Sequence, residues 1–310
     1  MNEPFVSVIV PTYNSERTIK KCIDSLLDID YSNYEIIIVD DGSSDKTRKI
    51  LSEHKGVIGV IESQHSGPSR CRNIAVKDAK GDFIAFTDSD CIVDRNWIKE
   101  LIKGFTQERV VGVGGIQISP NDETSFGKRV QEFFELTGFL GGYIKSGRNE
   151  ELVEVSHNPS CNAVYRKSAF LEIGGFDEKL WPSEDVDLDY RLKKKGYIFM
   201  FNPKAVVYHY RPQFLKALLK MMSRYGYVQG ILTKRYGFFR KIQIAPIFLI
   251  ILLILIFNNP FWLIVPLIFY LYSLLKIKYL VRASYVFILS ILSVTYWTAG
   301  FLGGLVALKK

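Results

Sequence analysis

Short apolar runs rich in Val, Ile and Phe alternate with longer amphipathic segments over the first 90 residues. The runs are Phe5–Val10, Glu35–Val39, Val57–Glu62 and Asp82–Thr87. Turn residues and a helical pattern follow each of them. Continuous apolar runs are typical of parallel strands that are buried on both faces, with helices as the crossover connections. The pattern therefore predicts an α/β, Rossmann-like domain with a mainly parallel sheet and flanking helices.

The last 70 residues have a different pattern, in which long uncharged runs replace the short ones. A membrane-spanning helix needs roughly 20 apolar residues. The third run is long enough by itself, whereas the first two need flanking basic side chains that reach the lipid headgroups. We expect two to three hydrophobic helices, at about 242–257, 261–276 and 284–307.

The charge is distributed as unevenly as the hydrophobicity. The net charge of +8 over 310 residues by itself suggests a nucleic-acid ligand. Residues 1–190 contain 22 basic and 32 acidic residues, whereas residues 191–310 contain 18 basic residues and no acidic one. Because the basic residues of this second part lie next to its apolar runs, a membrane surface explains their charge better than nucleic acid does.

The stretch 191–241 contains 13 basic residues and carries apolar residues at helical spacing, among them Phe214, Leu218 and Met222. A basic helix with an apolar face suits the surface of an anionic membrane. The alternative is a helix that packs against a core and exposes its basic face. We predict three parts: an α/β domain at 1–211, basic amphipathic interfacial helices at 212–241 and a membrane region at 242–310.

The orientation in the membrane follows from the flanking charges. No basic and hydrophobic leader pattern precedes the first strand, so we expect the α/β domain on the cytoplasmic side of a prokaryotic cell membrane. The basic clusters before the first apolar run and between the second and third then lie on that side, as the positive-inside rule requires. Lys309 and Lys310 would lie on the opposite side if the third helix spans.

The four cysteines, Cys22, Cys71, Cys91 and Cys161, form no C-x-x-C pair. Their spacing matches neither a disulfide framework nor a zinc ribbon. This usage fits a reducing compartment.

Small, polar and acidic residues follow each of the four predicted strands. These segments are Pro11–Asn14, Asp40–Asp45, Gly67–Asn73 and Asp88–Asp90. Ligands of open α/β sheets bind at the carboxyl ends of the strands. Helix capping would explain one such segment, but four in succession favour a binding site.

The residue types suggest a phosphorylated ligand. Asp88 and Asp90 bring two carboxylates near one point, which suits Mg²⁺ or Mn²⁺ bridging to a diphosphate. The loop at Gly67 opens a helix whose free N–H groups, with Arg70 or Arg72, suit a phosphate. The chain contains neither a P-loop nor a G-x-G-x-x-G after the first strand, which disfavours P-loop ATP chemistry and dinucleotide dehydrogenases.

Six segments together resemble the family 2 inverting glycosyltransferases, in order and in spacing, from residue 5 to about 211. They are Val6–Asn14, Asp40–Asp45, Asp88–Asp90, Asn162–Arg166, Gly174–Glu178 and Glu184–Leu192. The resemblance implies the GT-A fold and a nucleotide-activated sugar as donor. It also implies a divalent metal, Mn²⁺ or Mg²⁺, as cofactor.

The resemblance also implies roles for individual residues. The donor nucleotide would contact Pro11, Tyr13, Asn14, Asp41, Arg72 and Asp88. The metal would be held by Asp88, Asp90 and His209, and the general base would be Asp185. Glu184 and Asn162 would contact the acceptor or position the base. Arg224, in the basic stretch, is a candidate for gripping the phosphate of a lipid-linked acceptor.

The chemistry accounts for the base, because an acceptor hydroxyl must lose its proton as it attacks the anomeric carbon. The alternative for Glu184–Asp189 is a charged first turn that the helix dipole favours. We expect a membrane-bound enzyme that transfers a sugar from a UDP- or GDP-sugar. Its acceptor would be a polyprenyl phosphate, a lipid-linked glycan or a polysaccharide precursor, with anionic lipids as further partners and no nucleic acid. The alternative is an inactive nucleotide-sugar-binding or scaffold protein of the same fold.

Overall fold

The computed structural model describes residues 3–139 and 151–307. The chain divides into two compact units, one of residues 1–120 with 145–210, the other of residues 121–144 with 211–310. Residues 121–144, which the sequence assigned to the α/β domain, thus cluster with the C-terminal helices. Lys309 and Lys310 lie outside the described residues.

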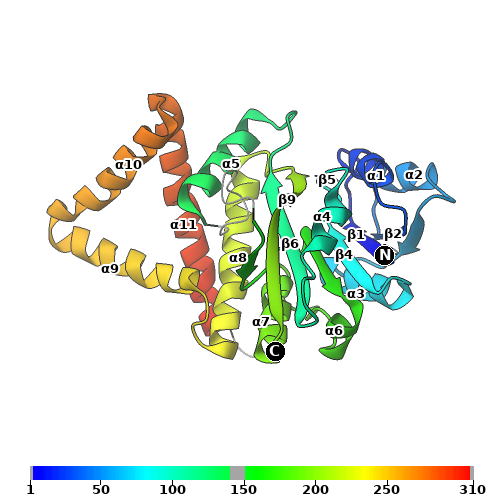
Figure 1. The fold of residues 1–310 in the computed structure, drawn as a ribbon. Helices are drawn as coiled ribbons and strands as arrows, with labels where there is room; N and C mark the ends of the chain where they lie inside the picture. The colour runs from blue at the N-terminus through cyan, green and yellow to red at the C-terminus, as the bar shows by residue number, and fades with distance from the viewer. Residues whose placement is uncertain (1–2, 140–150, 308–310) are drawn as a thin grey trace. The chain divides into compact units, whose positions relative to one another are not determined.

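A nine-stranded sheet forms the centre of the first unit (Figure 1). Its strands are β1 (Val6–Thr12), β2 (Tyr34–Asp40), β3 (Gly59–Glu62), β4 (Phe83–Thr87), β5 (Cys91–Val93), β6 (Val110–Ile118), β7 (Val153–Val155), β8 (Asn162–Arg166) and β9 (Ile198–His209). The order in space is β3-β2-β1-β4-β8-β6-β9-β5, and β7 pairs with β9.

The first four strands form the parallel half of the sheet, as the sequence predicts. β1 pairs in parallel with β2 and β4, and β2 pairs in parallel with β3. The other half is mixed, because β8 runs antiparallel to both β4 and β6. In this register Asn162 faces Thr87, the last residue of β4. The carboxyl ends of β1, β2 and β4 consequently meet at one edge of the sheet.

Helices cover both faces of this sheet. They are α1 (Ile19–Leu27), α2 (Thr47–Ser52), α3 (Pro68–Asp78), α4 (Trp97–Lys103), α6 (Lys167–Glu172) and α7 (Glu184–Lys194). Val8 of β1 packs into a core with α1, α2 and α4, whereas its neighbour Ile9 packs into a second core with α3, α6 and α7. Alternate residues of a strand point to opposite faces, so covering both faces requires the continuous apolar run seen in the sequence.

The second unit is helical in its described residues. It contains α5 (Ser125–Thr137), α8 (Leu215–Tyr236), α9 (Ala245–Asn258), α10 (Ile264–Ile277) and α11 (Leu280–Val306), with 3₁₀ turns at Lys241–Ile244 and Pro260–Leu263. Three stretches are long and apolar enough to cross a membrane: Lys241–Asn258, Pro260–Ile277 and Leu280–Val306. They fall on the three segments that the sequence singled out.

Glycines bring the backbones of α8 and α11 into direct contact. A Cβ at Gly226 of α8 would lie 1.9 Å from the carbonyl oxygen of Trp297, and one at Gly304 of α11 would lie 1.9 Å from that of Tyr227. Gly230 and Gly300 make equally close approaches. Each helix carries its glycines four residues apart, the spacing that lets apolar helices pack at short range.

The apolar face of α8, which the sequence assigns to a membrane surface, is divided in the structure. Leu218 and Met222 are fully buried, whereas Phe214 is 60 % exposed. Part of this face therefore packs inside the protein, and the interfacial role of 212–241 stays a prediction.

The close contact predicts that substitution by alanine destabilises the protein at Gly304 but not at the neighbouring Gly303. Gly304→Ala forces α8 and α11 apart, and we expect a loss of about 1–3 kcal/mol in the free energy of unfolding. Gly303→Ala is the matched control, because its Cβ would meet only the Tyr227 ring, at 3.7 Å. Denaturant unfolding of the detergent-solubilised protein measures both, and equal destabilisation would contradict the packing.

Candidate active site

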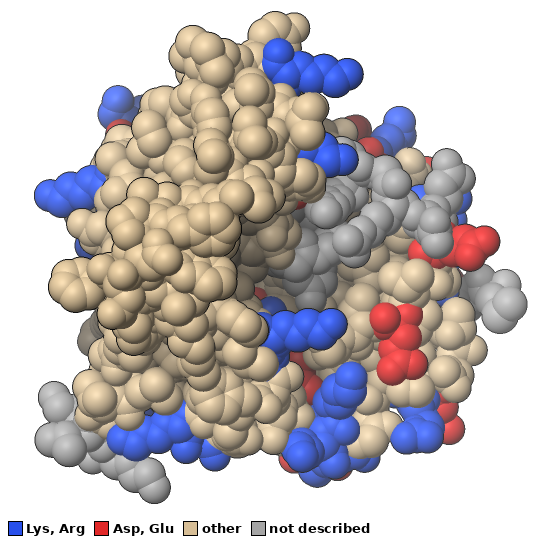
Figure 2. Space-filling model, turned by 90° about the vertical axis from the view of Figure 1, so that its left-hand side faces the viewer, with Lys and Arg blue, Asp and Glu red and all other residues tan. Residues whose placement is uncertain are grey.

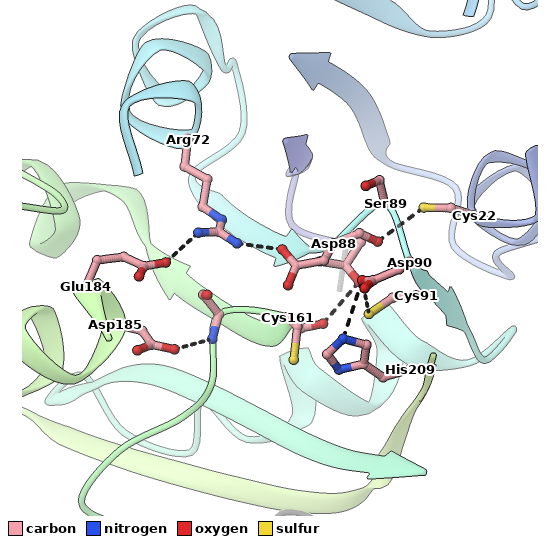
Figure 3. Close-up of polar contacts among 12 residues, drawn as sticks. Cys22, Arg72, Asp88, Ser89, Asp90, Cys91, Cys161, Glu184, Asp185 and His209 are labelled. Atoms are coloured by element: carbon pink, nitrogen blue, oxygen red, sulfur yellow. Dashed lines mark hydrogen bonds and ion pairs between the residues drawn. The ribbon is translucent and has the colours of Figure 1, made fainter. Parts of the chain in front are cut away.

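A buried arginine joins two carboxylates at the edge of the sheet. Arg72 of α3 donates from Nη2 to Asp88 Oδ1 at 2.5 Å and from Nη1 to Glu184 Oε1 at 2.6 Å (Figure 3). Asp88 directly follows β4, and Glu184 is the first residue of α7. The guanidinium therefore ties the end of a central strand to the start of the helix that carries the predicted base.

Burial and ion pairing shift the pKa values of Glu184 and Arg72 in opposite directions. Burial raises the pKa of Glu184 to about 7; Arg72 opposes the shift and the neighbouring Asp185 adds to it. For Arg72 itself, burial disfavours the charged form, but the carboxylates of Asp88 and Glu184 outweigh it and raise its pKa. One permanent cation thus faces two carboxylates, and Glu184 can take up a proton near neutral pH.

Backbone N–H groups hold the carboxylate of Asp185. Its Oδ2 accepts from the N–H of Ser160 at 3.0 Å and its Oδ1 from the N–H of Val186 at 2.8 Å. Asp185 is half-buried and lies in the first turn of α7. Negative charge there is favoured by the helix dipole. The position therefore fits either a carboxylate that only stabilises the helix start or one that also accepts a proton from an acceptor hydroxyl.

A buried network that the sequence did not reveal supports the segment at Ser160. Asp189, fully buried on α7, accepts from Tyr165 Oη at 2.9 Å and from the N–H of Asn158 at 2.8 Å, and pairs with His157 Nδ1 at 2.9 Å. Burial raises the pKa of Asp189, and His157 opposes this. The network anchors residues 157–160 to α7, and with them the N–H that holds Asp185.

Asp90 and His209 form the candidate metal site. His209 Nε2 lies 3.4 Å from Asp90 Oδ1, and His209 Nδ1 lies 3.3 Å from Gln117 Oε1. Burial alone would lower the pKa of His209, but Asp90 and Cys161 together outweigh it and raise the pKa to about 10. Antiparallel pairing of β5 with β9 places His209 opposite Cys91, the residue after Asp90, and so brings together side chains more than 100 positions apart.

A cluster of possible ligand atoms contains two of the three residues expected to hold the metal, Asp90 and His209, and the role of Asp88 as a ligand stays a prediction. Ligand atoms of Asp90, Cys91 and His209 lie within 4.8 Å of one another. Asp88, which the resemblance implies as a third ligand, is held by Arg72 and does not belong to this group. Figure 3 shows the Asp88 carboxylate between Arg72 and Asp90.

Three of the residues expected to contact the nucleotide, Tyr13, Asn14 and Asp41, lie directly after β1 and β2. Asp41 accepts from the N–H groups of Ser66 and Gly67, each at 2.7 Å. Burial opposes ionisation, but these N–H groups lower the pKa of Asp41. The Asp41 carboxylate thus holds the loop before α3 in place.

Two neighbours of Asp41 bound the same edge. Asn14 Oδ1 accepts from the N–H of Ser44 at 2.8 Å, which joins the loops after β1 and β2. Tyr13 is 45 % exposed and packs on the His65 ring at 4.3 Å between centroids. Pro11 is buried within β1. Tyr13 is therefore the exposed ring at this edge, available for stacking.

Asn162 and Arg224 are the remaining expected residues. Asn162 is fully buried; its side chain accepts from Trp97 Nε1 and donates to the carbonyl oxygens of Ile116 and Ala205. These bonds use its amide to connect β8 with neighbouring strands, and its expected role at the acceptor stays a prediction. Arg224 belongs to the second unit, on α8.

Removal of the Arg72 charge should destabilise the protein in a pH-dependent way. Arg72→Leu leaves buried Glu184 without its cation, and we expect a loss of about 3–5 kcal/mol at about pH 8. The loss should shrink towards about pH 5, because Glu184, whose pKa is already raised, then takes up a proton.

Arg70→Leu is the control for this change, since Arg70 lies exposed on the same helix. We expect its effect to stay within about 0.5 kcal/mol. Denaturant unfolding at both pH values decides the matter; a loss independent of pH would contradict the role given to Glu184.

Comparison with known proteins identifies the fold and the family. The model of the family described as Glycosyl transferase family 2 matches residues 7–174. A structure titled mannosyltransferase PcManGT from Pyrobaculum calidifontis, in complex with GDP-Man and Mn²⁺, has a TM-score of 0.64 and 19 % identity. The alignment covers 98 % of this chain and 88 % of that one. The mixed, mostly parallel sheet with its flanking helices is accordingly a GT-A fold.

Two curated relatives agree with the family. A Methanococcus voltae dolichyl N-acetyl-alpha-D-glucosaminyl phosphate 3-beta-D-2,3-diacetamido-2,3-dideoxy-beta-D-glucuronosyltransferase is 26 % identical over 270 residues, covering 82 % of each chain. The pre-mycofactocin glycosyltransferase of Mycobacterium tuberculosis is 30 % identical over 228 residues. These cover 71 % of this chain but only 46 % of that relative. The chain thus belongs to family 2 of the glycosyltransferases, and it is a glycosyltransferase.

Proposed function

We propose that this glycosyltransferase is metal-dependent and inverting, and that it transfers a sugar from a UDP- or GDP-sugar to a lipid-linked acceptor at a membrane. The observation that carries the proposal is the Arg72 bridge, which joins the strand end that bears Asp88 and Asp90 to the helix start that bears Asp185. Groups for the donor and a base for the acceptor are thereby held in one rigid arrangement.

In this proposal Asp185 accepts the proton of an acceptor hydroxyl as that oxygen attacks the anomeric carbon from the side opposite the diphosphate. Its carboxylate is already oriented by the N–H groups of Ser160 and Val186. A positioned base typically contributes about 10²–10⁴-fold in rate. The exposed ring of Tyr13 stacks on the nucleotide base, and the loops joined by Asp41 and Asn14 surround the ribose.

Asp90 and His209 are the residues that would hold the divalent cation. A carboxylate and an imidazole within 3.4 Å of each other suit Mn²⁺ or Mg²⁺ with a diphosphate and water as further ligands. Such an ion, when bound, stabilises the negative charge that develops on the leaving diphosphate. The structural neighbour whose title includes Mn²⁺ supports a divalent metal in general.

The second unit supports a membrane-embedded acceptor. Figure 2 shows a broad face without Asp or Glu, bordered by Lys and Arg side chains. Exposed apolar side chains of α9 and α10 include Phe248, Phe257, Leu267 and Leu275. Water disfavours such a large apolar surface, and lipid does not. We propose that α9, α10 and α11 anchor the enzyme in the cell membrane as a multi-pass protein with the GT-A unit on the cytoplasmic side.

The name of the Methanococcus relative, which includes a dolichyl-linked sugar phosphate, favours a lipid-linked glycan over a soluble acceptor. The candidate base favours a glycan hydroxyl over a polyprenyl phosphate as the acceptor group, because a sugar hydroxyl needs a proton acceptor, whereas a polyprenyl phosphate is already ionised. A polysaccharide precursor is the second candidate, favoured by the Staphylococcus aureus relatives named poly-beta-1,6-N-acetyl-D-glucosamine synthase.

Asp185→Asn separates the base from donor binding. The amide keeps an oxygen for the N–H of Ser160 but cannot take a proton, so we expect transfer to fall by about 10²–10⁴-fold while the dissociation constant of the donor stays unchanged. Turnover with radiolabelled nucleotide sugars and membrane lipid extract, together with calorimetric donor binding, measures the two effects.

Asp78→Asn is the matched control, because Asp78 is exposed at the far end of α3. It should change neither quantity. Loss of donor binding in Asp185→Asn would contradict the role of base, and the absence of turnover with every donor and lipid fraction in the wild type would refute the lipid-linked acceptor.

Metal binding should depend on Asp90 and on pH. We expect Asp90→Asn to weaken Mn²⁺ binding at least about tenfold, whereas Asp82→Asn, exposed before the opposite end of β4, leaves it unchanged. Below about pH 10 an ion at His209 must displace a proton, so affinity should rise by up to about tenfold per pH unit. Titration of Mn²⁺ by electron paramagnetic resonance tests both, and affinity that is flat with pH would contradict the raised pKa of His209.

A further inference from the structure

Two cysteine thiols lie at the back of the candidate metal site. The Sγ of Cys91 belongs to the group of ligand atoms, with Asp90 and His209, that lie within 4.8 Å of one another. The thiol of Cys161 is not a member of this group, but it lies close to the His209 ring. Figure 3 shows both sulfur atoms near that ring. Neither thiol is needed for the proposed transfer reaction.

The four side chains differ in their exposure to solvent. The side chain of Asp90 is 46 % exposed and that of His209 is 20 % exposed. Cys91 and Cys161 are buried, at 1 % and 6 % exposure. An ion can therefore enter past Asp90 and His209 and meet the two sulfur atoms behind them.

The four side chains differ chemically from a Mg²⁺ or Mn²⁺ site. Those hard cations prefer oxygen ligands in octahedral geometry, whereas thiolates select softer ions. Two sulfurs, one imidazole and one carboxylate are the ligand types that tetrahedral zinc accepts. The order of stability for divalent ions also places Zn²⁺ far above Mn²⁺ at such mixed ligands.

We propose that Asp90, Cys91, Cys161 and His209 form a thiolate site for Zn²⁺ that overlaps the site of the catalytic cation. Each thiol releases its proton to solvent as it binds the ion. Four protein ligands complete a tetrahedral shell, and a complete shell has no open position for a diphosphate. Zn²⁺ thus competes with Mn²⁺ or Mg²⁺ and inhibits transfer; this last consequence rests on the proposed function, whereas the binding does not.

A plain packing role is the competing explanation for both cysteines. A buried free Cys commonly serves as a small apolar residue, and both Cys91 and Cys161 belong to a hydrophobic core. Packing alone predicts that an ion at Asp90 and His209 has only nitrogen and oxygen ligands. The two explanations therefore differ in whether sulfur binds the ion.

Cobalt spectroscopy of the full-length, detergent-solubilised protein distinguishes them without any transfer reaction. Co²⁺ replaces Zn²⁺ and reports its ligands, because thiolate ligation produces a sulfur-to-cobalt charge-transfer band and tetrahedral geometry produces intense visible bands. We expect both features at one ion per chain, and we expect Zn²⁺ to displace the Co²⁺. Weak octahedral bands without charge transfer in the wild type would overturn the proposal.

Variants assign the sulfur ligands. Cys91→Ser and Cys161→Ser should each reduce the charge-transfer intensity by about half and weaken Zn²⁺ binding by about 100-fold, at the upper end of what perturbing a ligand's surroundings costs. Cys22→Ser is the matched control, since this buried thiol donates to the carbonyl oxygen of Asp88 at 3.5 Å but lies outside the ligand group. It should leave the spectrum unchanged.

Circular dichroism and Mn²⁺ binding of each variant establish that it is folded, and Cys91→Ala and Cys161→Ala provide replacements if a serine variant is not. A folded variant pair that retains wild-type Zn²⁺ affinity would refute the thiolate site. Inhibition of transfer by Zn²⁺ at constant Mn²⁺ is measured last. Its absence despite cobalt-thiolate bands would leave the binding site standing and refute only the competition with the catalytic ion.

Discussion

The geometry of the site depends on one buried cation with two carboxylates. Arg72 is buried, and its guanidinium forms its two hydrogen-bonded ion pairs only while Asp88 and Glu184 stay beside it. Breaking such a pair inside a protein costs several kcal/mol, so the end of β4 and the start of α7 cannot drift independently. The groups proposed to act on the donor and on the acceptor are therefore tied to each other by this ion pair.

A second layer of buried polar contacts extends this constraint. Asp189 binds Tyr165, His157 and the backbone of Asn158, and the segment so held presents the Ser160 N–H to Asp185. Such networks are stable only when every member finds a partner. The candidate base is thus positioned by contacts on both sides, from the Arg72 bridge and from the Asp189 network.

Local patterns in the sequence predicted the parallel half of the sheet, because strands buried on both faces are recognisable from their own residues. The same patterns located Asp41, Asp88 and Asp90 at strand ends, whereas Asp185 was indicated only by the resemblance to family 2 glycosyltransferases. They could not reveal the antiparallel insertion of β8, the burial of Asn162 or the approach of Cys161 to His209, since each depends on pairing between distant segments. Cys91 was the exception: its position directly after Asp90 was visible in the sequence, but its meaning required the register of β5 with β9.

The division of the chain has a consequence for biosynthesis. Because residues 121–144 belong to the helical unit, the polypeptide leaves the GT-A unit, returns to it and leaves again. Helix α5 is synthesised long before α11, which supplies Tyr285 against Phe126 and Arg282 beside Glu132. A nascent chain must therefore keep the apolar face of α5 from aggregating until the last helix has emerged. A single cut after residue 210 would release the first unit together with residues 121–144, which would then lack their partners in the helical unit.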